Sequence, residues 1–202
     1  MSLSAKYVVA IAVFSAATQG ASAQAVTASS QNVLPPFAHT VFCLRYPRDC
    51  EQSGSSRPVA DTLARHAELD FVNRHVNSSI APVTKEAGFD EKWIVAPLEG
   101  NCHDYAVTKR HDLLQMGWPS SSLQLAEVTL NTGEHHLILV ADIEGEPFIL
   151  DNLDPDVLSL ALTRSGYYWN RIESSDDPKF WSSTNIGHEK IRKFNTGLAP
   201  ET

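Results

Sequence analysis

The spacing of hydrophobic residues predicts helices in the first half of the chain. Apolar residues recur at helical intervals over residues 59–76, and Pro58 is suited to open that helix. A second pattern of this kind runs from about Cys102 to Met116, and Gly117 is typical of the position that ends a helix. Each helix should bury one face. For the first helix, the expected buried face consists of Leu63, Ala67, Phe71, Val72 and Val76.

Strand patterns follow in the second half of the chain. Asn131-Thr132-Gly133 and Glu144-Gly145 are turn signals between them. The sequence from Ser174 onward is polar and has little periodicity. Helices followed by an antiparallel meander indicate an α+β fold in one domain. The four expected strands are residues 123–130, 135–142, 147–153 and 167–172.

Residues 1–23 have the pattern of a secretory signal peptide. The apolar run of residues 7–17 is too short for a comfortable membrane span, and a small-x-small cleavage pattern follows it before Gln24. No later segment is long and apolar enough to cross a membrane, so we expect an exported protein without a membrane span after cleavage. The expected organisation is a signal peptide (1–23), a flexible segment (24–38), the folded domain (39–182) and a polar tail (183–202).

Charge and cysteine content narrow the class of protein. The formal net charge of −8 argues against nucleic acid or anionic lipid as a partner. Three cysteines leave one unpaired in an oxidising compartment, where Cys43 and Cys50 are close enough in sequence to be joined. Two reduced thiols are the alternative for that pair. A Cys43–Cys50 disulfide would leave Cys102 as the free thiol, as a nucleophile must be.

Cys102 belongs to a set of residues that suits acyl transfer. It stands at the start of the second expected helix, where unpaired amides favour a thiolate and can hydrogen-bond an oxyanion. Asn101 and Cys102 are the candidates for that oxyanion contact. His136 and Asp151 lie on neighbouring expected strands. A thiol, an imidazole base and an orienting carboxylate are the parts of a cysteine acyl-transfer enzyme.

The register of those two strands decides which histidine meets the carboxylate. If Glu144-Gly145 is the centre of a tight hairpin, His136 and Asp151 project from the same face as diagonal neighbours. A loop of odd length would select His135 instead. Each residue alone also has a structural interpretation: a buried cysteine, an inward-facing histidine and an aspartate in a turn.

Residues 101–104 also admit a zinc site. Asn101, Cys102, His103 and Asp104 could form a compact ligand set. However, consecutive residues at a helix start point in different directions, and no Cys-x-x-Cys or His-x-x-x-His spacing supports zinc. Asp104 is more simply an acid in the first turn, where it interacts favourably with the helix dipole.

A string of spaced motifs connects the chain to a known family. The motifs are Phe42-Cys43, Val72-Asn73-x-x-Val76-Asn77, Ile80-x-Pro82, Asp90-x-x-Trp93, Cys102-x-Asp104-Tyr105-Ala106-Val107-x-Lys109-Arg110, Leu113-x-x-x-Gly117-Trp118-Pro119, His136 before an apolar strand, and Leu150-Asp151-Asn152-Leu153. With these motifs the chain resembles the bacterial transglutaminase-like cysteine peptidases, periplasmic enzymes of Gram-negative bacteria. The resemblance covers about residues 40–182.

The resemblance implies a papain-like transglutaminase core, in which the nucleophile lies at a helix N-terminus packed against an antiparallel sheet. Cys102, His136 and Asp151 match the family's nucleophile, base and orienting acid. The resemblance also implies a periplasmic location and limited proteolysis of a protein substrate, namely a surface adhesin. It further implies regulation by a receptor in the inner membrane that sequesters the peptidase.

One departure from the family concerns calcium. The resemblance implies calcium dependence, and the calcium-dependent members have Asp-Cys-Glu-Asp around the nucleophile. This chain has Asn101-Cys102-His103-Asp104. Two carboxylates are therefore missing, and calcium prefers several hard, anionic oxygens. We expect no cofactor, and Asp104 is the candidate for any residual calcium site.

The sequence thus predicts an exported, periplasmic cysteine peptidase that acts through a thioester acyl-enzyme. Two rival interpretations stay open. A transglutaminase or a protein-glutamine deamidase would use the same triad and differ in the acyl acceptor and the shape of the cleft. An inactive transglutaminase-like module that binds a protein partner is the other rival, although such a module has no need to keep all three residues.

Overall fold

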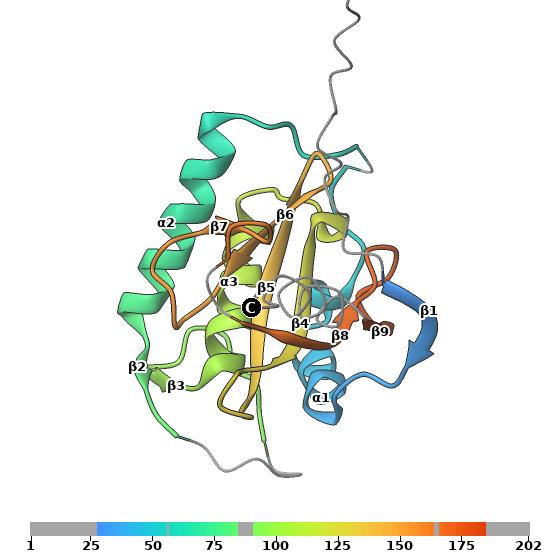
Figure 1. Cartoon of the computed structure of the whole chain (residues 1–202), viewed down its shortest axis with the longest axis vertical. Coiled ribbons are helices and arrows are strands. Elements are labelled where there is room, and N and C mark those ends of the chain that lie inside the picture. Colours follow the sequence, from blue (N-terminus) through green and yellow to red (C-terminus); the bar gives the residue numbers. More distant parts are fainter. Residues whose placement is uncertain (1–27, 56, 85–90, 164–165, 185–202) are drawn as a thin grey trace, which may run out of the picture.

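The computed structural model describes residues 28–55, 57–84, 91–163 and 166–184. Its helices pack against an antiparallel sheet, as expected for the α+β class (Figure 1). In chain order the elements are β1 (Ala28–Val33), α1 (Phe37–Arg45), a 3-10 helix (Pro47–Cys50), α2 (Leu63–Ser79), β2 (Ala81–Pro82), β3 (Glu99–Gly100), α3 (Cys102–Gln115), a second 3-10 helix (Ser120–Ser122), β4 (Leu123–Thr129), β5 (His135–Ile143), β6 (Glu146–Leu150), β7 (Leu158–Ser159), β8 (Tyr168–Glu173) and β9 (Trp181–Thr184).

A seven-stranded antiparallel sheet organises the described residues. Its strand order is β1-β9-β8-β4-β5-β6-β7, so β1, the blue strand of Figure 1, lies at one edge. Alternate residues of β5 belong to two separate clusters. Leu137 and Leu139 pack with α3 in the larger core, whereas Ile138 and Val140 pack in a smaller cluster. Burial on both faces explains why β5 has a continuous run of apolar residues.

The β5–β6 hairpin has the register that the sequence predicts. Ile143 pairs with Glu146, and the two-residue turn Glu144-Gly145 lies between them. Both turn residues have positive φ angles, 52° and 86°, as a type I′ turn requires. The twist of such a turn matches that of the two strands, and its even length puts the candidate base and acid on the same face of the sheet.

Helix α2 buries a face that matches the predicted one only in part. Val72 and Val76 are buried as predicted, whereas Leu63 and Phe71 are 90% and 60% exposed. Leu69 and Asn73 are buried in addition. Asn73 occupies a buried position because its amide donates to the backbone carbonyls of Asp154 and Pro155 (3.0 and 3.2 Å). A polar residue therefore lies in the buried stripe, where a pattern of apolar residues alone does not find it.

Both ends of the domain contain strands that the sequence pattern does not indicate. β1 lies within the segment expected to be flexible (24–38), and β9 extends past the expected domain end at residue 182. The two strands pair with each other, and Trp181 is fully buried in the core. Both strands are short and their partners are distant in sequence, so local periodicity does not reveal them. The expected signal peptide (1–23) lies outside the described residues.

Cys43 and Cys50 form the disulfide that the sequence predicts, and Cys102 is the free cysteine. We expect replacement of both bridged residues by serine to lower the free energy of unfolding by about 2–3 kcal/mol, because the unfolded chain gains the entropy of an open loop. Urea unfolding of the oxidised protein and of the double variant would measure this difference. Non-reducing peptide mapping is the control, and a major species with Cys102 in a disulfide would contradict the assignment.

Candidate active site

A reciprocal capping box fixes the start of α3. The Asn101 side chain accepts the N–H of His103 (3.3 Å), and the Asp104 carboxylate accepts the N–H of Asn101 (3.0 Å). A Cβ at Gly100 would lie only 2.7 Å from that carboxylate, so this close approach requires glycine. Cys102 is thus held at the first position of a helix whose start is fixed by its neighbours on both sides.

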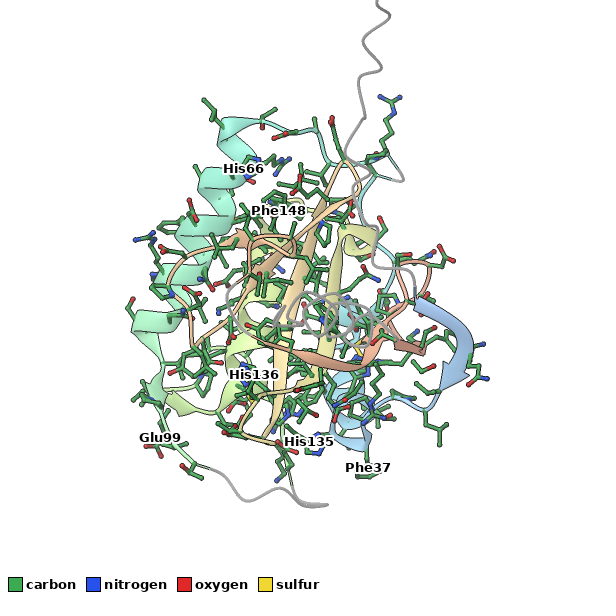
Figure 2. All side chains as sticks on the ribbon, viewed as in Figure 1. Phe37, His66, Glu99, His135, His136 and Phe148 are labelled. Carbon is green, nitrogen blue, oxygen red and sulfur yellow. A yellow bond between two sulfur atoms is a disulfide. The ribbon has the colours of Figure 1, made fainter. Side chains whose placement is uncertain are left out.

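His136 and Asp151 form a buried pair, with His136 near one end of β5 (Figure 2). Nε2 of His136 donates to Oδ1 of Asp151 at 2.7 Å, and the side chains are only 3% and 2% exposed. The carboxylate is itself fixed, because the Tyr167 hydroxyl donates to Oδ2 (2.5 Å) and the N–H of Leu153 donates to Oδ1 (3.0 Å). Since the carboxylate takes Nε2, Nδ1 of His136 is the nitrogen left to interact with the Cys102 thiol, which helps to raise the pKa of this histidine.

The neighbouring His135 lies outside this arrangement. Its side chain is 74% exposed, and its Nδ1 is 3.7 Å from the carboxylate of Glu127. Figure 2 shows His135 and His136 at the same end of β5. Successive residues of a strand point to opposite faces, so the even-length turn directs only His136 toward Asp151. The loop of odd length that would select His135 is not present.

The electrostatics of the site favour a thiolate next to an imidazolium. Burial raises the pKa of Cys102, but hydrogen bonds and positive charge from His103 and His136 outweigh it and bring that pKa down to about 6. Burial lowers the pKa of His136, but its contacts with Asp151 and Cys102 outweigh it and raise that pKa to about 9. Between about pH 6 and pH 9, the sulfur is therefore anionic and His136 is cationic.

Sequence reasoning missed several contacts that build the site. Tyr167 was expected only to begin a strand, yet its hydroxyl holds the Asp151 carboxylate. The Asn77 amide, on α2, donates to the backbone carbonyl of Asp151 (2.9 Å). The sequence suggests His103 only as a zinc ligand or as a replacement for a calcium-binding carboxylate, yet its Nδ1 lies 2.5 Å from Oε1 of Glu91. The Asn77 position does occur in a family motif, but the spacing of the residues does not indicate these contacts.

The side-chain oxygens next to Cys102 are hydrogen-bonded within the fold. The two carboxylate oxygens of Asp104 accept the backbone N–H groups of Ile94 (2.9 Å) and Asn101 (3.0 Å). The side-chain oxygen of Asn101 accepts the N–H of His103. His103 itself offers nitrogen, which calcium accepts poorly. The buried Asp104 therefore acts as a capping residue, and its oxygens are already engaged in the fold.

In the described part of the chain, residues 101–104 are not among the compact groups of potential metal ligands. In the described ranges, a compact group of potential ligands consists of His39, Cys43 and Cys50. Its two sulfur atoms are joined in the disulfide. Zinc binds cysteine as a thiolate, so this group is not a zinc site in the oxidised protein.

Comparisons with known proteins identify the family. The sequence model of the bacterial transglutaminase-like cysteine proteinases (BTLCP) matches residues 29–189, and no curated protein matches the chain. Among solved structures, calcium-bound LapG of Legionella pneumophila is similar with a TM-score of 0.50 and 19% identity, over 67% of this chain and 82% of that chain. EGTA-treated LapG has a TM-score of 0.49 and 20% identity, over 68% and 78% of the two chains.

These findings carry different weight. The likeness to calcium-bound LapG shows the fold, a helix-and-sheet arrangement of the transglutaminase-like type. The family match spans most of the chain and includes Cys102, His136 and Asp151. The chain therefore belongs to the bacterial transglutaminase-like cysteine proteinases and is a cysteine peptidase of that type.

Proposed function

We propose that this protein is an exported, periplasmic peptidase that makes limited cuts in a protein substrate with a triad of Cys102, His136 and Asp151. The observation that carries the proposal is the buried pair of His136 and Asp151, 2.7 Å apart, whose imidazole also lowers the pKa of the free Cys102 thiol. Burying a thiol, an imidazole and a carboxylate together lowers the free energy of unfolding, because these groups lose contacts with water. Catalysis explains that cost, whereas three separate structural roles do not.

Acylation is the first half of the proposed reaction. The Cys102 thiolate attacks the scissile carbonyl carbon, and the π electrons of the carbonyl move to its oxygen. When the carbonyl re-forms, the C–N bond breaks and the leaving amine takes a proton from the His136 imidazolium. The products are an amine, a thioester on Cys102 and a neutral His136. Asp151 keeps Nδ1 of the ring directed at the reacting atoms throughout.

Hydrolysis of the thioester is the second half. His136 takes a proton from a water molecule, whose oxygen attacks the thioester carbonyl carbon. Collapse of this intermediate breaks the C–S bond and releases a carboxylic acid. Cys102 leaves as a thiolate beside the protonated His136, so the starting ion pair is restored.

Fewer backbone N–H groups are left to bind the oxyanion than the sequence predicts. Asn101 and Cys102 were both expected as donors, but the N–H of Asn101 already donates to Asp104. The N–H of His103 likewise donates to the Asn101 side chain. We assign the oxyanion hydrogen bond to the N–H of Cys102, at the positive end of the α3 dipole.

Substrate and location follow from the family resemblance rather than from the geometry. The resemblance favours a surface adhesin as the substrate and an inner-membrane receptor as the regulatory partner. The helices in the described part of the chain include none that is long and apolar enough to cross a membrane. The net charge of −8 gives no support for nucleic acid as a partner.

The proposal is tested by comparing cells that carry the full-length protein with cells that carry its Cys102→Ala variant. Mass spectrometry of the periplasmic and released proteins should find new N-termini only with the unchanged protein. His135→Ala is the matched control and should give the same new termini. Cross-linked or deamidated glutamine without any new terminus would instead identify an acyl transferase or a deamidase. No difference between the cells would support the inactive binding module.

Calcium removal gives a separate prediction. Because the oxygens of Asp104 and Asn101 are engaged in capping α3, millimolar EGTA should leave both the cleavage rate and the melting temperature essentially unchanged. Fluorescent thermal melting and a cleavage assay with and without EGTA would measure this. Micromolar calcium binding by titration calorimetry, lost in Asp104→Ala, would show that a site exists in an altered form.

A further inference from the structure

His103 occupies a site built around its ring. Its Nδ1 lies 2.5 Å from Oε1 of Glu91, and the two side chains are only 21% and 15% exposed. The ring stacks on Trp93, with the centroids 5.0 Å apart and the planes inclined by 11°. Trp93 is itself 2% exposed and belongs to the core. A carboxylate and a fixed aromatic face therefore hold the imidazole next to Cys102. Few residues in the first turn of a helix are fixed by two such contacts.

His103 directly follows Cys102 at the start of α3. The imidazoles of His103 and His136 both lower the pKa of Cys102, through hydrogen bonding and positive charge. Each imidazole has its own carboxylate, Glu91 for His103 and Asp151 for His136. Two imidazole–carboxylate pairs therefore act on the thiol. The acid of the same turn, Asp104, accepts the backbone N–H groups of Asn101 and Ile94.

We propose that His103, held by Glu91 and Trp93, is a second histidine of the active site, whose positive charge stabilises the Cys102 sulfur as a thiolate. This inference rests on the proposed function, because His103 acts on the same sulfur. It assigns different roles to two histidines, whereas a three-residue triad has only one. His136 moves protons, and His103 supplies a fixed charge.

The environments of the two rings support these different roles. Burial lowers the pKa of His103, but its contacts with Cys102 and Glu91 outweigh it and raise that pKa to about 10. The pKa of His136 rises only to about 9. At neutral pH both rings are therefore cationic, and His103 is the poorer proton donor of the two. A cationic aromatic ring is also suited to stack on the electron-rich face of Trp93.

The test is the pH dependence of Cys102 alkylation in the full chain, measured by iodoacetamide labelling and mass spectrometry from pH 4 to pH 9. Removing the charge in His103→Gln should move the midpoint upward by about one to two pH units and slow labelling at pH 6 by about 5- to 50-fold. Glu91→Gln should move the midpoint in the same direction by a smaller amount. His135→Gln, at an exposed position, is the matched control and should leave the profile unchanged.

The outcomes separate the inference from the proposed function. An unchanged midpoint in a folded His103→Gln protein would overturn the inference, and so would a lower melting temperature without a shifted profile. If His103→Gln does not fold, the profile of Glu91→Gln decides: an unshifted midpoint overturns the inference. Alkylation needs no substrate, so this result is independent of proteolysis. Cleavage that persists in Cys102→Ala would remove the proposed function while leaving the labelling profile intact.

Discussion

His136→Ala is expected to reduce kcat/KM on the protein substrate by about 10²–10⁴-fold, the range that a positioned acid–base group contributes. The variant loses the group that protonates the leaving amine and deprotonates water. It also loses one of the two imidazoles that lower the pKa of Cys102. Labelling of Cys102 at pH 6 should therefore slow along with cleavage. Steady-state kinetics with the purified protein and a cleavable fragment of the substrate would measure the loss.

The adjacent histidine provides the control for this variant. His135→Ala removes an imidazole of the same type one residue away, but its ring is 74% exposed and faces Glu127. We expect kcat/KM to change by less than about twofold, since surface changes away from the site have small effects. If His135→Ala were the more damaging of the two, the assignment of the base would be wrong, even though the strand register is correct.

Glu173→Ala is expected to have the largest effect on stability, about 3–5 kcal/mol, because it breaks a buried ionic network. Glu173 is 1% exposed, and its carboxylate contacts Nε2 of His39 at 3.0 Å and lies 3.6 Å from Nε of Arg110. It also accepts the N–H of Leu125 at 3.0 Å. Removing it would leave the buried guanidinium of Arg110 without its carboxylate. Urea unfolding with an unchanged m-value would measure the loss.

The exposed ion pair between Arg74 and Asp156 provides the comparison. Its atoms are 3.0 Å apart, but the side chains are 61% and 55% exposed. Asp156→Ala should therefore cost no more than about 1 kcal/mol, because water screens the pair. Equal losses for Asp156→Ala and Glu173→Ala would show that burial does not decide the strength of these pairs.

Local signals in the sequence account for the parts of the site that could be predicted. A two-residue turn at Glu144-Gly145 fixes the register of β5 and β6. Counting residues outward from this turn puts His136 and Asp151 on the same face of the sheet. The start of α3 is equally local, because the capping residues lie within three positions of the nucleophile. Both features follow from residues that are close in sequence, and both are present in the structure.

The features that the sequence does not reveal depend on distant partners. Tyr167 holds Asp151 from the position just before β8, and β1 pairs with β9 from the opposite end of the domain. Asn73 appears as a polar residue on a helix, and only the loop after β6 makes it a buried one. Spacing detects a repeated apolar face, but it does not detect a single polar residue whose partner is far away in sequence. The buried ion pairs of Glu173 are not predicted either, because His39 and Arg110 are distant from it in sequence.

The most direct test of the account is intact-mass spectrometry of the protein quenched in acid during turnover of its protein substrate. The proposed reaction forms a thioester, so an adduct with the mass of the N-terminal half of the cleaved segment should appear on Cys102. Hydroxylamine should remove it, and Cys102→Ser should show neither adduct nor cleavage. Cleavage by Cys102→Ser at the rate of the unchanged protein, without any adduct, would contradict the assignment of Cys102 as the nucleophile.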